Sequence, residues 1–261
     1  MTYADVNGIN LYYEAHGTGR PLILLHGGLG SGAMFGANID ALAKAGHQVI
    51  AVDLQGHGRT ADIDRPIDIK LMAGDIVALI EHLKLAKPDV VGYSLGGGVA
   101  FFTALRRPDL LRKLVLISTA MRASAYYPEI RSQQTVMDGN TAEMMKGTPM
   151  YQSYVQVAPR PEDWSRLITK MGQSMSDSFD YSAELPKLQV PTLIVFADGD
   201  MSPPSHAVEM YEALGGGQHD GGWDKSGLPV HRLAIIPGET HYSIFMAPTL
   251  APVINSFLGE D

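Results

Sequence analysis

The sequence predicts an α/β protein with a mostly parallel, doubly wound sheet and a helical cap inserted into it. Short apolar runs of strand length alternate with amphipathic helical patterns over most of the chain. Such alternation favours a parallel sheet that helices cover on both faces. The alternation is interrupted between about residues 119 and 186. Residues 1–119 and 187–261 are therefore expected to form the core, and residues 120–186 the cap.

The composition argues against several classes of protein. The chain has 261 residues, of which 45% are hydrophobic, and is long enough to bury a large core. A net charge of −8 without a basic run argues against nucleic acid and anionic membranes as partners. The absence of cysteine excludes disulfides, thiolate metal sites and a cysteine nucleophile. No apolar run approaches the roughly 20 residues that span a bilayer, and the N-terminus lacks signal-peptide features, so a cytoplasmic protein is expected.

The first predicted elements are a hairpin and two buried strands with a helix between them. TYADVNGINLYYEAHG alternates around Asn7–Gly8, a pair typical of a two-residue hairpin turn. PLILLHGG and HQVIAVD are short apolar runs typical of buried strands. Residues 33–45 have apolar side chains at helical spacing and stop at Gly46, which predicts a helix.

The next elements run up to the interruption. IKLMAGDIVALIEHLKL predicts an amphipathic helix with Leu71 on its apolar face. A strand is then predicted to end at Tyr93, a helix to run from Ser94 to about Arg107, and KLVLIS to form another strand. Beyond the cap, PTLIVFA and HRLAIIP predict strands, PPSHAVEMYEAL predicts a helix, and a last helix is expected over about residues 246–258.

The segment over residues 120–186 is interpreted as a lid. It holds more than half of the 13 methionines, and ASAYYPEIRSQQ, TAEMMKG and PEDWSRLITKMGQSM are expected to form short helices. Flexible methionine and amphipathic tyrosine side chains would line an adaptable apolar pocket. The alternative is an ordinary helical layer in which the same side chains are core.

DVVGYSLGGGVA places one serine between glycines, where a strand is predicted to end and a helix to begin. Ligands of a parallel sheet bind beyond the carboxyl ends of its strands. A sharp strand-to-helix turn would expose Ser94 there, and the N-terminus of the next helix would favour a developing oxyanion. Ser94 is thus the predicted nucleophile, with a structural turn serine as the alternative. A serine hydroxyl also needs an adjacent base.

His241 and two aspartates follow strands at the same predicted edge. In this architecture the expected chain order is serine, acid, histidine, and His241 lies just past the last apolar strand. Asp198 and Asp200 both follow PTLIVFA, and strand alternation does not separate residues two apart. Asp198–Gly199 is interpreted as a turn. Asp200 is then the first residue free to reach the histidine loop, and is the predicted acid.

Two backbone N–H groups are predicted to stabilise an oxyanion. One belongs to Leu95, the residue after the nucleophile. The other is expected in HGGLGSG, where Gly28 can turn its N–H towards Ser94. The alternative is that HGG is simply a glycine-rich turn into a helix.

LLHGGLGSG, AVDLQGHGRT, VVGYSLGGGVA, LIVFADGD and PGETHYSIF, in this order, resemble the α/β-hydrolase fold superfamily. The likeness runs from about residue 7 to the C-terminus and is weakest over the cap. It implies a Ser94–Asp200–His241 triad with Gly28 and Leu95 as oxyanion donors, and no metal or other cofactor. The departure at Ala197, where the superfamily often has glycine, is small.

The resemblance also implies a structural role for DLQGHGRT, so Asp53 and His57 are given no catalytic role. A serine at position 94 disfavours the relatives with an aspartate nucleophile. The implied activity is that of a serine esterase or lactonase, acting through an acyl-enzyme on a small-to-medium ester or lactone. C–C bond hydrolases and cofactor-free perhydrolases share the triad and stay alternatives, although perhydrolases often carry proline where this chain has Leu29.

A small-molecule receptor of the same fold is the non-enzyme alternative, and the oligomeric state is left open. If the cap is a lid, four of its side chains are candidates for substrate contact. They are Met144, Met145, Tyr151 and Trp164.

Overall fold

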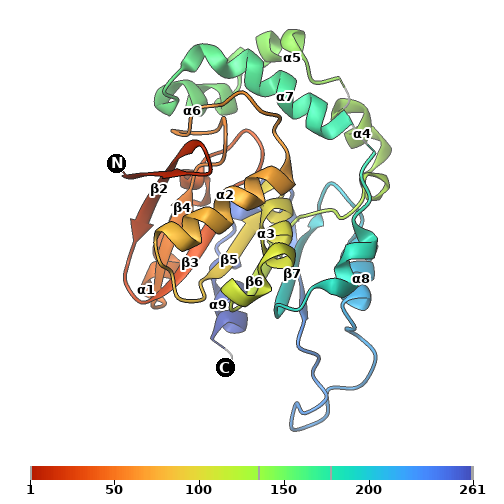
Figure 1. The fold of residues 1–261 in the computed structure, drawn as a ribbon. Coiled ribbons are helices and arrows are strands. Elements are labelled where there is room, and N and C mark those ends of the chain that lie inside the picture. The colour runs from red at the N-terminus through yellow and green to blue at the C-terminus, as the bar shows by residue number, and fades with distance from the viewer. Residues whose placement is uncertain (1, 135, 177, 260–261) are drawn as a thin grey trace.

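Eight strands form one sheet in a computed structural model that describes residues 2–134, 136–176 and 178–259. The strand order is β1-β2-β4-β3-β5-β6-β7-β8 (Figure 1). The pairs β1–β2 and β2–β4 are antiparallel, and all later pairs are parallel. The strands are β1 Thr2–Val6, β2 Ile9–His16, β3 Arg20–Leu25, β4 His47–Val52, β5 Asp89–Tyr93, β6 Leu114–Ile117, β7 Thr192–Gly199 and β8 Arg232–Thr240. The predicted mostly parallel α/β sheet is confirmed.

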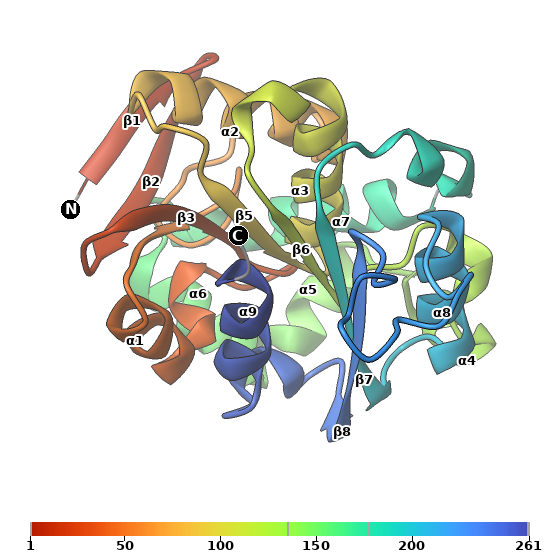
Figure 2. The same ribbon diagram turned by 90° about the horizontal axis from the view of Figure 1, so that it is seen from below.

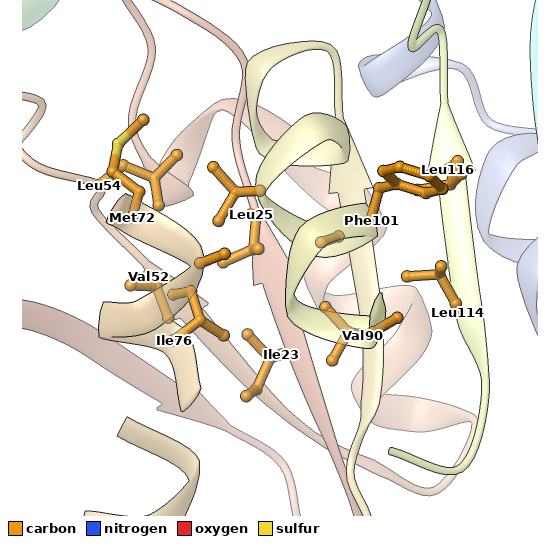
Figure 3. Packing of buried hydrophobic residues seen from close by; sticks show 14 of the residues in the cluster. Ile23, Leu25, Val52, Leu54, Met72, Ile76, Val90, Phe101, Leu114 and Leu116 are labelled. Carbon is orange, nitrogen blue, oxygen red and sulfur yellow. The ribbon is translucent and has the colours of Figure 1, made fainter. Parts of the chain in front are cut away.

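Helices cover both faces of this sheet (Figure 2). On one face α2, α3 and α8 contribute to a large apolar cluster with the sheet, and on the other α1 and α9 do so. Figure 3 illustrates the first cluster, where Met72 and Ile76 of α2 and Phe101 of α3 point towards strand residues such as Val90. These helices are α1 Ala37–Lys44, α2 Ile69–His82, α3 Leu95–Arg106, α8 Pro204–Ala213 and α9 Leu250–Leu258.

The elements differ from the predicted ones where backbone conformation or packing decides. Gly36, with φ 51°, separates a short 3-10 turn from α1, so the predicted helix over residues 33–45 is divided in two. Leu71 was placed on the buried face of α2, but it is exposed and Met72 is buried instead. The strand β7 continues through Gly199, so the predicted turn at Asp198–Gly199 is wrong. The last helix begins only at Leu250.

The segment between β6 and β7 is helical and lies over one end of the sheet (Figure 1). Its helices are α4 Pro128–Gln134, α5 Gly139–Met144, α6 Pro149–Val157 and α7 Trp164–Ser176, of which α6 was not predicted. The two ends of the segment meet in a short bridge: the Ala123 N–H donates to the Phe179 carbonyl at 2.8 Å, and the Tyr181 N–H donates to the Met121 carbonyl at 2.7 Å. The helices of this segment, here called the cap, therefore leave and rejoin the core at one place.

A buried carboxylate ties the cap to the core. Asp62, in the connection between β4 and α2, accepts hydrogen bonds from Lys170 Nζ of α7 at 2.6 Å and from Gln55 Nε2 at 2.8 Å. Arg166 Nε of α7 lies 2.7 Å from the same carboxylate. Lys170 also donates to the carbonyls of Ile63 and Arg65. The helix α7 is thus fixed to the core by charged groups in a mostly buried setting.

Candidate active site

Ser94 occupies the sharp turn between β5 and α3. Its φ of 51° and ψ of −115° lie outside the regions that L-residues favour. The turn is possible because glycines flank it: a Cβ at Gly92 would collide with the Gly96 carbonyl, and one at Gly96 would collide with the Leu25 carbonyl. A non-glycine residue held in such a conformation is characteristic of functional sites. The hydroxyl therefore projects from the carboxyl edge of the sheet and stays partly exposed.

The structure brings Ser94 together with His241 and Asp200. The Ser94 Oγ lies 3.1 Å from His241 Nε2, and His241 Nδ1 lies 2.7 Å from Asp200 Oδ1. These three residues come from the ends of β5, β7 and β8, far apart in the sequence. Both distances are within hydrogen-bonding range, so the three side chains form a continuous chain of hydrogen bonds.

Asp198 and Asp200 are separated by a local irregularity in the β7–β8 pairing. The register shifts between Ala197 and Gly199, which breaks the strand alternation that would have aimed both side chains the same way. The exposed Asp198 accepts the Gly238 N–H at 2.9 Å. The buried Asp200 faces His241 instead.

Hydrogen bonds keep the Asp200 carboxyl ionised. Burial alone would raise its pKa, but hydrogen bonds from His241, Ser118 and the Met201 N–H lower the pKa below its ordinary value. His241 is held in turn through its backbone, because the Tyr93 hydroxyl donates to the His241 carbonyl at 2.5 Å. The Tyr93 ring also packs 5.1 Å from the imidazole, centroid to centroid. The imidazole is thus fixed from both sides.

The loop after β3 and the start of α3 present backbone donors beside Ser94. Leu95 is the first residue of α3, where N–H groups have no acceptor within the helix. Among the described residues, neither the Leu95 N–H nor the Gly28 N–H donates a hydrogen bond within the chain. Leu29 has φ 60°, so the loop bends sharply just after Gly28. Both N–H groups thus lack an acceptor among the described residues, and their role as oxyanion donors stays a prediction.

The four cap side chains predicted to contact substrate differ in burial. Met144 is 76% exposed. Trp164 is buried and donates from Nε1 to the Ala142 carbonyl at 3.0 Å, inside the packing of the cap. Met145 and Tyr151 are partly buried against the large apolar cluster. Substrate contact by these four side chains stays a prediction.

Met171 of α7 was not singled out from the sequence, yet it touches the loop after β3. Its Cε lies 2.8 Å from the position that a Cβ on Gly28 would occupy. The side chain is 1% exposed, so its methyl group is held in place over Gly28. Only the tertiary fold brings residues 28 and 171 together, and no sequence motif signals it.

Three further groups near the site are buried. His26 donates from Nδ1 to the Gly27 carbonyl at 2.7 Å and accepts at Nε2 from the Leu54 N–H at 3.0 Å. Asp53 accepts the N–H groups of Gly32 and Arg59. Burial lowers the pKa of His26 to about 4 and that of His57 to about 3. These contacts shape the loops after β3 and β4.

The described residues contain neither a metal-binding cluster nor a membrane-spanning helix. In residues 2–134, 136–176 and 178–259, no group of three or more histidine, aspartate or glutamate side chains is arranged to hold a metal ion. Within the same ranges, every helix is too short or too polar to cross a bilayer.

Comparisons with known proteins identify the family. The sequence model of the alpha/beta hydrolase fold family matches residues 20–151, half of the chain. A candidate carbamate hydrolase, RutD, from Azorhizobium caulinodans is 30% identical and is aligned over 100% of this chain and 99% of its own. A non-heme haloperoxidase from Rhodococcus erythropolis is 28% identical over 76% of this chain and 81% of its own.

The fold comparison agrees with the sequence comparisons. The crystal structure of an enol-lactonase from Burkholderia xenovorans LB400 superposes with a TM-score of 0.73. It covers 99% of this chain and 100% of its own, with 22% identical residues, which is a likeness of fold. Together with the eight-stranded sheet and its cap, these matches show that the chain belongs to the α/β-hydrolase fold family and is a hydrolase of that fold.

Proposed function

We propose that the protein is a serine hydrolase that cleaves a small-to-medium carboxylic ester or lactone. The observation that carries the proposal is the chain of hydrogen bonds from Ser94 Oγ through His241 to Asp200, at 3.1 Å and 2.7 Å. A serine next to a base that a carboxylate orients is the arrangement required for an activated hydroxyl nucleophile.

In the first half of the reaction, Ser94 Oγ attacks the substrate carbonyl while His241 Nε2 takes the hydroxyl proton. The Asp200 carboxylate accepts a hydrogen bond from the protonated Nδ1 of His241. This bond keeps the lone pair of Nε2 directed at the serine. The carbonyl oxygen becomes an oxyanion that accepts from the N–H groups of Gly28 and Leu95. Loss of one such donor typically costs about 10²–10³ in rate, so two fixed donors contribute several kcal/mol.

In the second half, His241 returns the proton to the leaving alkoxide oxygen, and the acyl group stays on Ser94. Water then attacks this acyl-enzyme, with His241 accepting the water proton. Collapse of the second tetrahedral intermediate releases the carboxylic acid and returns the proton to Ser94. In a lactone the alcohol and the acid leave as one molecule. Every proton in the sequence passes through His241 Nε2.

The cap supplies apolar surface over the reacting edge. Met171 lies against Gly28, so its methyl group borders the space beside the proposed oxyanion donor. Methionine adapts to irregular apolar ligands, which fits an ester with an aliphatic part. Met145 and Tyr151 are proposed as further contacts with the substrate. For Met144 and Trp164 the same proposal rests only on the sequence.

Hydrolysis of a carbamate is a second candidate, favoured by the relative that aligns with this chain along its whole length. A carbamate offers the same type of carbonyl to Ser94 and would use the same donors. The haloperoxidase relative keeps the perhydrolase alternative open. Perhydrolases of this fold often carry proline at the position of Leu29. Leu29 has a φ of 60°, a conformation that proline does not adopt, which argues against the perhydrolase alternative.

The decisive experiment compares wild type with Ser94→Ala on short esters, long esters, lactones, carbamates and amides. A serine-directed phosphonate should add one label per chain at Ser94 and abolish hydrolysis of the preferred substrate, with no effect of chelators. Turnover that persists after complete labelling of Ser94 would contradict the mechanism. C–C bond hydrolysis is tested in the same assay with a vinylogous diketone, and a receptor would show no repeated turnover on any substrate.

A further inference from the structure

Ser118 lies at the carboxyl end of β6, between the strand that ends at Ser94 and the strand that ends near Asp200. Its backbone has φ 49°, in the left-handed region that costs an ordinary L-residue roughly 1–2 kcal/mol. The Ser118 N–H donates to the Val195 carbonyl of β7 at 2.8 Å, which holds the residue against the sheet. A serine kept in this conformation needs an explanation in what its side chain does.

The Ser118 side chain is 2% exposed and its hydroxyl donates to Asp200 Oδ2. The other carboxylate oxygen, Oδ1, accepts from His241 Nδ1 and from the Met201 N–H at 2.8 Å. Oδ2 has one further partner, the Ala197 N–H at 3.3 Å. Among the described residues, Ser118 is therefore the one side chain that bonds Oδ2.

We propose that Ser118 is a positioning residue for the triad: its hydroxyl fixes Asp200 Oδ2 so that Oδ1 stays aimed at His241. This inference rests on the proposed function, because it assigns Ser118 a role through Asp200. It goes beyond that function because nothing in the triad itself requires a fourth side chain at the end of β6.

The physical basis is the freedom of a carboxylate to turn. The terminal torsion of aspartate is broad and roughly two-fold, so burial alone does not decide which oxygen faces the histidine. A hydrogen bond to an ionised group is about twice as strong as a neutral one. The Ser118 hydroxyl thereby selects one orientation, and it also stabilises the buried charge of Asp200, which would otherwise be costly.

The titratable groups that face Asp200 come from several elements. His241 follows β8, Tyr93 ends β5, Tyr126 precedes α4, and Tyr242 follows His241. The Tyr126 pKa is raised to about 12 by burial and the neighbouring Asp200 charge, and the pKa values of Tyr93 and Tyr242 are raised as well. These three tyrosines therefore stay protonated and neutral at acid pH, so Asp200 is the anion that the Ser118 hydroxyl faces.

The test is Ser118→Gly, a change that removes the hydroxyl while suiting the left-handed backbone. We expect kcat to fall roughly 10- to 100-fold, the order of loss that a small misplacement of a catalytic group causes, with KM within about twofold. The acid limb of kcat should move to higher pH. Without the Ser118 hydroxyl, the charged form of Asp200 loses a hydrogen-bond donor, so the pKa of Asp200 should rise. The less stabilised negative charge also favours a proton on the neighbouring imidazole, so the base is inactivated at a higher pH.

Two further variants separate the hydroxyl from the backbone. Ser118→Ala removes the same hydroxyl without the backbone freedom of glycine and should reproduce both changes. Lys84→Gly relieves an equivalent left-handed residue, φ 53°, in the loop that leads into the amino end of β5, opposite the end at which Ser94 lies, and should keep wild-type kcat and pH profile. Circular dichroism and Tm establish that each variant is folded under the assay conditions.

Folded Ser118→Gly and Ser118→Ala proteins with wild-type kcat and acid limb would overturn the proposal. So would a fall in kcat without movement of the acid limb, since that is the effect of a purely structural serine. The proposed function fails differently: Ser94→Ala would then keep its turnover, whatever the Ser118 variants do.

Discussion

Asp198 and Asp200 lie two residues apart at the end of β7, yet they meet different surroundings. Asp198 is exposed and accepts the Gly238 N–H of β8, whereas Asp200 is buried against His241. We expect Asp200→Asn to keep the fold and to lower kcat by roughly 10⁴, because the amide holds the histidine in the wrong tautomer. Steady-state kinetics on the preferred ester measure this.

The matched control is Asp198→Asn, which changes the same functional group two residues away. It should leave kcat close to wild type, with at most a small loss of Tm from the weaker Gly238 hydrogen bond. A large loss at Asp198, together with near-normal Asp200→Asn, would reassign the acid and leave Ser94 and His241 in place.

Met171 gives a prediction about substrate range. Replacing it with alanine opens space beside Gly28, so the ratio of kcat/KM for branched over unbranched acyl groups should rise by roughly tenfold. Met150→Ala, in an exposed position on α6, is the control and should leave the ratio unchanged. If Met171→Ala lowers Tm and does not alter the ratio, the side chain serves only as core.

What the sequence predicts at this scale depends on the range of the interaction. Motifs with fixed local geometry predict Ser94 and His241 at one edge of the sheet. The preference for Asp200 over Asp198 depended on a turn that does not form, and the irregular pairing of β7 with β8 separates the two aspartates instead. The contacts of Ser118 and Met171 depend on residues more than 80 and 140 positions away, and no local pattern encodes them. The bulge after Ala197 is a similar case, since strand alternation assumes a regular ladder.

At the scale of elements, the attachment of α7 to the core decides how firmly the cap is held. Lys170, with a side chain 15% exposed, and Arg166 both bind Asp62, whose side chain is 3% exposed. Asp62→Asn leaves Lys170 without its carboxylate and leaves Arg166 with only the exposed Asp64, 3.9 Å away. We expect a loss of about 3 kcal/mol in the free energy of unfolding, the usual effect of breaking a buried pair from one side. Urea denaturation measures it.

The control for this prediction is Glu184→Gln, which breaks the exposed Lys187–Glu184 pair in the same segment of the chain. Exposed pairs contribute about 0–1 kcal/mol, so its stability should stay near that of wild type. Equal losses in the two variants would show that burial of Asp62 adds nothing to the attachment of α7.

Element prediction succeeded where the apolar period was regular and failed where a single conformation or contact intervened. The hairpin at Asn7–Gly8 formed as predicted, because both residues have the positive φ that this turn requires. The helix α2 was found, but its buried face includes Met72 in place of Leu71, since helical periodicity gives the face only approximately. The amphipathic signal of α6 was too short to be recognised without its neighbours.

At the scale of the whole molecule, buried histidines link stability to pH. The folded pKa values of His26 and His57 are about 4 and about 3, below the ordinary 6.5. Above pH 6.5 both residues are neutral in the folded and unfolded chains, and their contribution to stability is fully present. Below pH 6.5 the unfolded chain takes up protons first, so stability should fall by about 1.4 kcal/mol per pH unit for each group.

Unfolding in urea at a series of pH values from 7 to 4.5 measures this slope. His57→Asn should reduce it, because the asparagine amide can replace the ring nitrogen that bonds the Gln55 carbonyl but does not titrate. His219→Asn, at an exposed position, should leave the slope as in wild type. An unchanged slope in His57→Asn would assign the acid sensitivity to other groups.

The bridge that closes the cap has a consequence for how such a protein can change over evolutionary time. Because Ala123 and Phe179 are hydrogen-bonded neighbours, the polypeptide between them begins and ends at a single place. An insertion, deletion or wholesale exchange of that stretch leaves the spacing and order of β6 and β7 untouched. This stretch can therefore change in length or sequence while the strands that end near Ser94, Asp200 and His241 keep their order in the sheet.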